Sequence, residues 1–109
     1  MFFRPLAASI YCNIYCQGME RLFACDPKKR TWLLAERGFD LLATAEVFAD
    51  RRRLDYPDRR FDYGEERRVA IGKALGRVFT VIYTMRGPVT WLITAWPANR
   101  KERDHYGHN

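Results

Sequence analysis

Residues 78–83 read VFTVIY, and after a short turn residues 89–95 read VTWLITA. Both segments are rich in β-branched and aromatic residues, which favour strands. The first is apolar at nearly every position, so we expect a central strand that is covered on both faces. Arg86-Gly87-Pro88 between them is a turn signal, and the two strands are therefore expected to run antiparallel.

Working outward, a third strand is expected just before this pair. Residues 68–73 alternate between apolar and polar side chains, and a turn at 74–76 leads into the central strand. The segment 50–68 is polar and rich in arginine. It is expected to form a loop or an edge strand.

Two helices are expected ahead of the sheet. The first begins at Asp26-Pro27, because Asp accepts hydrogen bonds from the first amides and Pro gives up no needed donor. It ends at Gly38, which supplies a left-handed residue. The second helix is capped by Asp40 and ends near residue 49.

A third helix is expected at the C-terminus, where Asn99-x-x-Glu102 has the spacing of a capping box. The order of elements predicts an α+β fold, in which two N-terminal helices pack on an antiparallel β-meander that a C-terminal helix follows. We expect the helices to cover one face of the sheet.

The composition indicates one globular domain. The chain has 109 residues, of which 48% are hydrophobic and 29% charged, so it is able to bury a core. The absence of a long apolar run excludes a membrane span as its main feature. Residues 1–19 carry a single charge and are expected to be an N-terminal extension outside a domain that comprises residues 20–109.

The charge favours an anionic partner. Lys and Arg number 19 against 13 Asp and Glu, a formal net charge of +6, which suits nucleic acid or an acidic protein. The alternative is that a basic balance only keeps the protein soluble. The three cysteines lack the paired spacing of zinc or redox sites. We therefore expect no metal, no cofactor and a cytoplasmic location.

The motifs of several enzyme classes are absent. The sequence has no G-x-S-x-G, P-loop, H-E-x-x-H or G-x-G-x-x-G, which removes the usual basis for acyl transfer, nucleotide hydrolysis, zinc proteolysis and dinucleotide redox chemistry. Cations and aromatics remain, and these fit phosphates and unstacked bases. The competing interpretation is that the arginines are solvated and the aromatics belong to the core. The aromatic candidates are Tyr63, Tyr83, Trp91, Trp96 and Tyr106.

Short motifs in a fixed order run through residues 20–106. They are Phe23-x-x-Asp26-Pro27-x-Lys29, Gly38, Ala45-x-Val47-Phe48-x-Asp50, Gly64-Glu65-Glu66-Arg67 before Ile71-Gly72, Tyr83-Thr84-x-Arg86-Gly87, Ile93-Thr94-Ala95 and Arg100-x-Glu102-Arg103-x-x-Tyr106. In this order they resemble the BrnT toxins. Each motif alone is weak, and the series is fairly specific.

The resemblance implies a bacterial type II toxin with a RelE-like fold, an endoribonuclease that is neutralised by a BrnA antitoxin, which in turn binds operator DNA. In such enzymes the ribose 2′-OH attacks the adjacent phosphate without a metal, and cationic side chains stabilise the transition state. The catalytic candidates that match the family pattern are Lys29, Arg67, Arg86, Tyr83 and Glu66. The RNA-binding candidates are Lys28, Arg68, Arg100 and Arg103.

The chain also departs from the family pattern. Where the family typically has Asn-x-x-Lys-His-Gly at the end of the first helix, this chain has Glu36 and Arg37 before Gly38. Where the third strand of the family usually ends in Ser-Ala-Arg, this chain has Thr94-Ala95-Trp96. A proton carrier and a phosphate-binding cation are thereby lost. The alternative function is a catalytically weak or inactive protein that binds an antitoxin or nucleic acid, with Trp96 as a partner-binding anchor.

The change of composition at residue 19 yields the first prediction. We expect translation in nature to start at Met19, because the family resemblance begins a few residues later. The intact mass of protein expressed from its own upstream region measures this. A chain that begins at Met1 would contradict the expectation.

Overall fold

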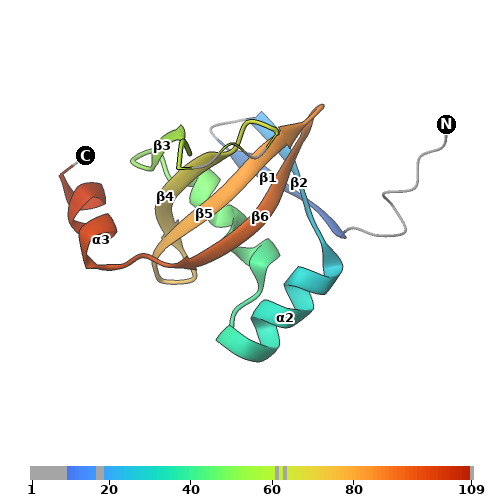
Figure 1. Ribbon diagram of the computed structural model, residues 1–109, viewed down its shortest axis with the longest axis horizontal. Helices are drawn as coiled ribbons and strands as arrows, with labels where there is room; N and C mark the ends of the chain where they lie inside the picture. The colour runs from blue at the N-terminus through green and yellow to red at the C-terminus, as the bar shows by residue number, and fades with distance from the viewer. Residues whose placement is uncertain (1–9, 17–18, 61, 63, 109) are drawn as a thin grey trace, which may run out of the picture.

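The computed structural model describes residues 10–16, 19–60, 62 and 64–108, and in this part of the chain it is a mixed α+β fold around a six-stranded sheet (Figure 1). Tyr63 lies outside the described residues. The order of strands across the sheet is β1-β2-β6-β5-β4-β3. The elements are β1 (Ile10–Cys16), β2 (Met19–Cys25), α2 (Pro27–Arg37), the 3-10 helix η1 (Leu41–Ala49), β3 (Leu54–Pro57), β4 (Arg68–Ala74), β5 (Arg77–Arg86), β6 (Val89–Pro97) and α3 (Arg100–Gly107).

The predicted meander is confirmed. β4, β5 and β6 pair antiparallel, and β3 adds an antiparallel edge strand from within the polar segment. In β5, residues 79–84 are buried, as the expectation of a central strand covered on both faces requires. β5 alternates its side chains between two apolar layers: Phe79 and Val81 face one layer and Ile82 the other.

Two further strands extend the sheet beyond the predicted meander. β2 pairs parallel with β6, with Leu22 opposite Val89, and β1 pairs antiparallel with β2, with Ile10 opposite Cys25. The antiparallel meander is therefore only part of a mixed sheet. The pairing brings the backbone of residues 10–16 into the sheet, while the domain boundary at residue 19 stays a prediction.

Both N-terminal helices begin and end at the predicted residues. Asp26 accepts a hydrogen bond from the Lys28 amide at 2.9 Å, and Gly38 ends α2 in the left-handed conformation at φ 79°. Asp40 caps η1 and also receives two hydrogen bonds from Arg30, at 2.7 and 2.8 Å, which tie α2 to η1. The hydrogen bonds from Arg30 hold the pKa of Asp40 below its usual value despite partial burial.

The second helix is a 3-10 helix, and its burial follows the three-residue period of that helix. A 3-10 helix has three residues per turn, so side chains three apart stack in rows. Two rows are buried and the third faces outward. The buried rows are Leu41, Thr44, Val47 and Leu42, Ala45, Phe48.

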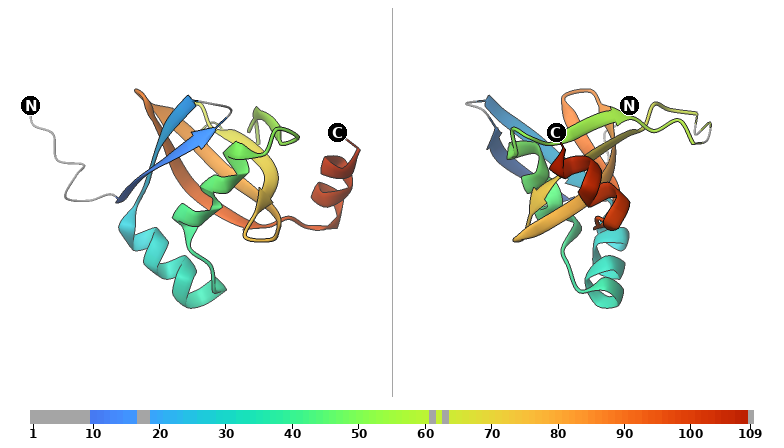
Figure 2. Two further views of the ribbon diagram at one scale, coloured as in Figure 1. Left: turned by 180° about the vertical axis from the view of Figure 1, so that it is seen from behind. Right: turned by 90° about the vertical axis from the view of Figure 1, so that its left-hand side faces the viewer.

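η1 covers one face of the sheet, behind it in Figure 1 and in front of it when the molecule is seen from behind in Figure 2. Phe48 lies at the centre of this layer, with its ring 5.3 Å from that of Phe23 and 4.8 Å from that of Tyr83. α2 packs against η1 and buries only Leu33. The sequence predicts that two helices pack on the sheet. η1 does so, whereas α2 packs against η1 and projects away from the sheet.

The expectation that all helices share one face is wrong for α3. β4 points Ala70 toward η1, but Val69 and Ile71 toward the opposite face, where they form a second cluster with Ile82. This second apolar face also needs cover. α3 covers part of it, with Tyr106 packed against the cluster.

Contacts at both ends hold α3 against the sheet. The predicted capping box is present, and Glu102 also accepts a hydrogen bond from the Trp96 indole at 3.1 Å. At the other end Tyr106 donates to Asp50 at 2.6 Å. Burial alone would raise the pKa of Asp50, but the hydrogen bonds from Tyr106 and from the amides of Lys73 and Arg52 outweigh it and lower that pKa. No helix in the described part of the chain has the length and apolar character that crossing a membrane requires.

This contact gives a stability prediction. Tyr106→Phe removes a hydrogen bond to a charged carboxylate, so the free energy of unfolding is expected to fall by about 1 kcal/mol at neutral pH. Because the folded pKa of Asp50 is lowered, its stabilisation is present above the unfolded pKa of about 4 and is lost as the pH falls through the folded value. The difference from wild type should therefore shrink in acid.

Urea unfolding at neutral and acidic pH measures both effects. Lys101→Ala, at an exposed position of the same helix, is the control and should change stability little. Equal stability of Tyr106→Phe and wild type at neutral pH would contradict this role of Asp50.

Candidate functional site

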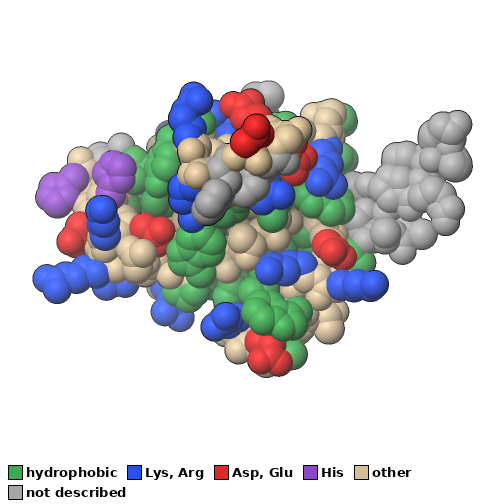
Figure 3. All heavy atoms as spheres, viewed as in Figure 1, with side chains coloured by type: hydrophobic (Ala, Val, Ile, Leu, Met, Phe, Trp, Pro, Cys, Tyr) green, Lys and Arg blue, Asp and Glu red, His purple; other side chains and the backbone are tan. Residues whose placement is uncertain are grey.

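A pocket of about 580 Å³ opens between the start of α2, the segment before β4 and the strand β6. It lies on the face that α3 covers in part, since Ile93 of its lining belongs to the second apolar cluster. Figure 3 shows Lys and Arg side chains around apolar surface on the side that faces the viewer in Figure 1. The pocket is lined by Asp26, Lys29, Glu65, Arg67, Arg86, Trp91, Leu92, Ile93 and Thr94.

A bulge in β6 shapes this lining. Ile82 pairs with Thr94 and Tyr83 with Leu92, which leaves Ile93 as an extra residue opposite β5. A bulge of this kind bends the strand and re-aims its side chains, and such bulges recur beside functional sites. Here it falls within the part of β6 that lines the pocket.

Three cations come together from three separate elements. Lys29 stands in the first turn of α2, Arg67 directly precedes β4, and Arg86 ends β5. The Arg86 guanidinium lies 4.4 Å from the centre of the Trp91 ring, a cation–π contact that holds it over the pocket. With Asp26 and Glu65 as the acidic members, the lining keeps an excess of positive charge.

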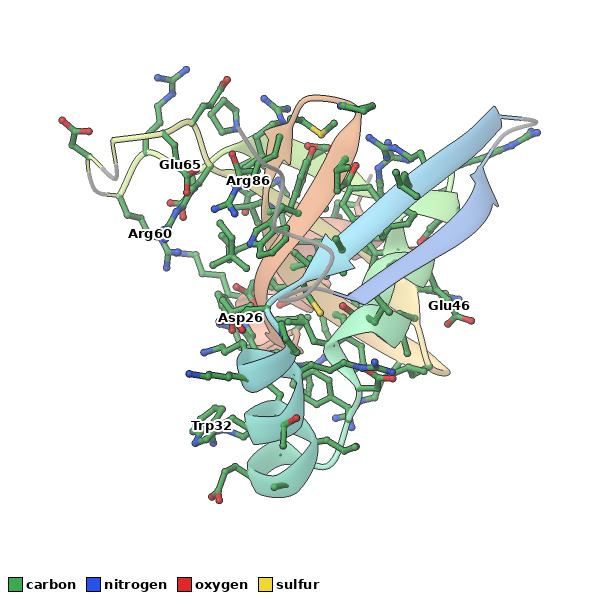
Figure 4. All side chains as sticks on the ribbon, turned by 90° about the vertical axis from the view of Figure 1, so that its right-hand side faces the viewer. Asp26, Trp32, Glu46, Arg60, Glu65 and Arg86 are labelled. Atoms are coloured by element: carbon green, nitrogen blue, oxygen red, sulfur yellow. The ribbon has the colours of Figure 1, made fainter. Side chains whose placement is uncertain are left out.

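Glu65 stands between two of these cations. Its carboxylate oxygens lie 3.6 Å from Nε of Arg67 and 3.7 Å from Nη2 of Arg86. Figure 4 shows Glu65 and Arg86 close together above Asp26 at the start of α2. The two arginines thus share one carboxylate, with one of its oxygens near each guanidinium group.

Comparison with known families assigns the chain. Residues 25–102 match the model of the ribonuclease toxin BrnT of a type II toxin-antitoxin system. The chain belongs to the BrnT family. The matched region contains every residue of the pocket lining, whereas β1 lies outside it. A search of curated proteins found no match.

Of the five catalytic candidates in this BrnT-family chain, Lys29, Arg67 and Arg86 meet at the pocket. Glu66 does not line it. Glu65 and Arg67 both line the pocket, while Glu66 is 74% exposed and its carboxylate lies 4.0 Å from the Arg68 guanidinium. The carboxylate at the pocket is the neighbour of the one that the sequence favoured.

Tyr83, another catalytic candidate, is buried on the η1 face. Its hydroxyl donates to Asp55 at 2.7 Å and accepts from Nε of Arg68 at 3.2 Å, which joins β3, β4 and β5. Burial, reinforced by the hydrogen bond to Asp55, raises the pKa of Tyr83 to about 12. The Tyr83 hydroxyl therefore belongs to the hydrogen bonds that join the strands, and it does not line the pocket. The same contacts take the RNA-binding candidate Arg68 away from the pocket.

The remaining candidates lie elsewhere. Lys28 flanks an apolar surface on α2 beside Trp32, which is 46% exposed. Arg100 and Arg103 are on α3, where Arg103 donates to the Ala98 carbonyl at 2.8 Å. Trp96 lines a separate hollow of about 180 Å³ next to α3.

Sequence reasoning left Asp26, Glu65 and Thr94 out of the site, and it noted Trp91 only as one aromatic among several. Glu65 and Glu66 stand side by side in the same motif, and nothing in the sequence separates the one at the pocket from its neighbour. The bulge at Ile93 had no sequence signal either. Among the described residues, no group of three or more His, Cys, Asp or Glu side chains converges as a metal site would require.

The placement of Tyr83 yields a prediction. Tyr83→Phe leaves Asp55 with one partner fewer in a half-buried setting, so the free energy of unfolding should fall by about 1–2 kcal/mol. Thermal and urea unfolding measure this. Unchanged stability together with lost activity would instead support the catalytic assignment of Tyr83.

Proposed function

We propose that this chain is an endoribonuclease that cleaves RNA by attack of a ribose 2′-OH on the adjacent phosphate, without a metal ion. The observation that carries the proposal is the convergence of Lys29, Arg67 and Arg86 beside Trp91 in one pocket. Family membership supplies the ribonuclease class. The nucleophile and the mechanism are our inference.

RNA carries its own nucleophile, the 2′-OH, so the protein does not have to supply one. What the reaction needs from the pocket is stabilisation of negative charge on the phosphate. The 2′-hydroxyl oxygen attacks phosphorus and its proton passes to water, the bond to the 5′-oxygen breaks and that oxygen takes up a proton from water, and negative charge builds on the phosphate oxygens in between. Preorganised cations stabilise that charge more than they stabilise the ground state. Guanidinium groups match two phosphate oxygens at once, and Arg67 and Arg86 are directed at one point by their shared contact with Glu65.

Trp91 adds a surface for a base. Its ring lines the pocket next to Arg86, and bases of single-stranded RNA stack on aromatic side chains. An RNA that lays one phosphate between the arginines would bring a flanking base to the ring. We propose that single-stranded RNA is the substrate and that the cytoplasm is the site of action.

The alternative of an inactive binding protein rests on the departures at Glu36, Arg37 and Trp96. None of the three belongs to the pocket lining that the structure describes. Arg37 instead lies 5.4 Å from the Trp32 ring, and Trp96 is hydrogen-bonded to Glu102. Because these replacements leave the cationic pocket intact, we favour the catalytic function.

We also propose a BrnA-like antitoxin as the partner, with contact to operator DNA only through that antitoxin. The type II toxin-antitoxin family supplies the class of partner. A basic pocket is best neutralised by an acidic or helix-donating segment that covers it. We further propose that the fold is RelE-like, with helices packed around the sheet as in that class of toxin.

The test is cleavage of total RNA by purified protein. Arg86→Ala and Arg67→Ala should abolish cleavage. Arg86 is 50% exposed, and its substitution should change the free energy of unfolding by less than about 0.5 kcal/mol. Arg100→Ala, which removes an equal charge on α3, should keep activity.

Two outcomes would contradict the proposal. One is full activity of Arg86→Ala, which would separate the pocket from the reaction. The other is an inactive wild type, which would favour the binding protein. Arg67 is less exposed than Arg86, so its alanine variant is more prone to unfold. In that case Arg67→Lys, which keeps the charge but loses the two-pronged guanidinium group, is the variant to test.

A further inference from the structure

The carboxylate of Glu65 holds a position that a phosphate group would take. Its two oxygens divide between Arg67 and Arg86, at 3.6 and 3.7 Å, in the pocket that also contains Lys29. We infer that Glu65 is an internal anion, which occupies the arginine pair in the free protein and is displaced when a substrate phosphate binds. The inference rests on the proposed function and names the step by which its substrate enters.

The contacts of Glu65 are of a kind that a ligand is able to replace. Both distances are longer than the 2.7–2.9 Å of a charge-assisted hydrogen bond. The side chain is 34% exposed, and ion pairs in such settings stabilise little because water screens them. A phosphate group that bonds directly to both guanidinium groups offers shorter contacts.

The arginine pair keeps its place when the carboxylate leaves. Arg86 retains its contact with the ring of Trp91 at 4.4 Å. Arg67 is anchored at the backbone, because its carbonyl accepts a hydrogen bond from the Asp58 amide at 2.8 Å next to the start of β4. Displacement of Glu65 therefore exposes a cationic pair that already faces the pocket.

The local chain explains how Glu65 reaches this point. Gly64 adopts φ 76°, a conformation that favours glycine, and its amide donates to the Asp62 side chain at 3.0 Å. Directly after this turn, the Glu65 carboxylate lies near Arg67 and Arg86. Glu66, one position further, points to the other side and pairs with Arg68 at 4.0 Å.

An internal anion has a defined effect on binding. It offsets part of the positive charge of the arginine pair and occupies both guanidinium groups, so an incoming anion must first displace it, and the observed affinity is lower than the affinity of the pair without Glu65. Glu65→Gln keeps the size of the side chain and removes the charge. It should therefore raise the affinity for phosphate, even though the residue lines the binding pocket.

The experiment is a calorimetric titration of inorganic phosphate into the full chain at constant ionic strength. Glu65→Gln should bind phosphate about three- to tenfold more tightly than wild type, the range expected for two screened ion pairs. Glu66→Gln is the matched control, since it changes the net charge equally one residue away, and it should bind less than about twofold more tightly. The double variant Glu65→Gln, Arg86→Ala should lose the gain.

Equal or weaker binding by Glu65→Gln would overturn the inference, as would equal gains in both single variants. Glu65→Ala provides a second test if the glutamine variant fails to fold. The RNA cleavage assay separates this result from the proposed function. If Glu65→Gln binds phosphate more tightly but wild type cleaves no RNA, the proposed ribonuclease function is overturned and the internal anion stands. If wild type cleaves RNA but Glu65→Gln binds phosphate no more tightly, the internal anion is overturned and the proposed function stands.

Discussion

The burial of β5 on both faces is the constraint on which the rest of the structure depends. Its side chains alternate between two apolar layers, so the sheet needs cover on each side. η1 supplies one cover with Phe48 at its centre, and burial of a side chain of that size contributes about 1.5–3 kcal/mol. α3 covers only part of the other face. The uncovered remainder, next to α2, is where the pocket forms.

The pocket follows from how the chain leaves and enters the sheet. Arg86 ends β5, Arg67 directly precedes β4, and Lys29 is placed by the helix that follows β2. Parallel pairing of β2 with β6 brings the start of α2 beside the bulged part of β6. Residues from distant parts of the sequence therefore meet because strand pairing sets their positions, and Glu65 offsets part of the positive charge that they bring together.

Local signals explain why much of the fold was predictable from the sequence. The cap at Asp26, the stop at Gly38 and the capping box from Asn99 depend on residues close in the chain, and all three are present. β2 was missed because its parallel partner is far away in sequence and its pattern lacks alternation. The sequence of residues 78–83 already indicated two covered faces, but it did not say which helix covers the second; the register of β4, which puts Val69 and Ile71 beside Ile82, shows that this helix is α3.

The candidate site was also predictable only in part. Lys29, Arg67 and Arg86 were found through the order of motifs, and the structure groups them. Tyr83 and Glu66 carry the right chemistry, but strand alternation and burial put them elsewhere. The bulge that adds Ile93 and the neighbouring Thr94 to the lining arises from the pairing of two strands, which no single segment encodes.

We propose that this pocket, rather than the basic surface of α3, binds the phosphate backbone of RNA. Titration of a short single-stranded DNA, which lacks the 2′-OH and is not cleaved, into isotopically labelled protein tests it by NMR. If RNA binds in the pocket, the side-chain signals of Arg67, Arg86 and the Trp91 indole should shift. Shifts confined to Arg100 and Arg103, with the pocket signals unchanged, would contradict it.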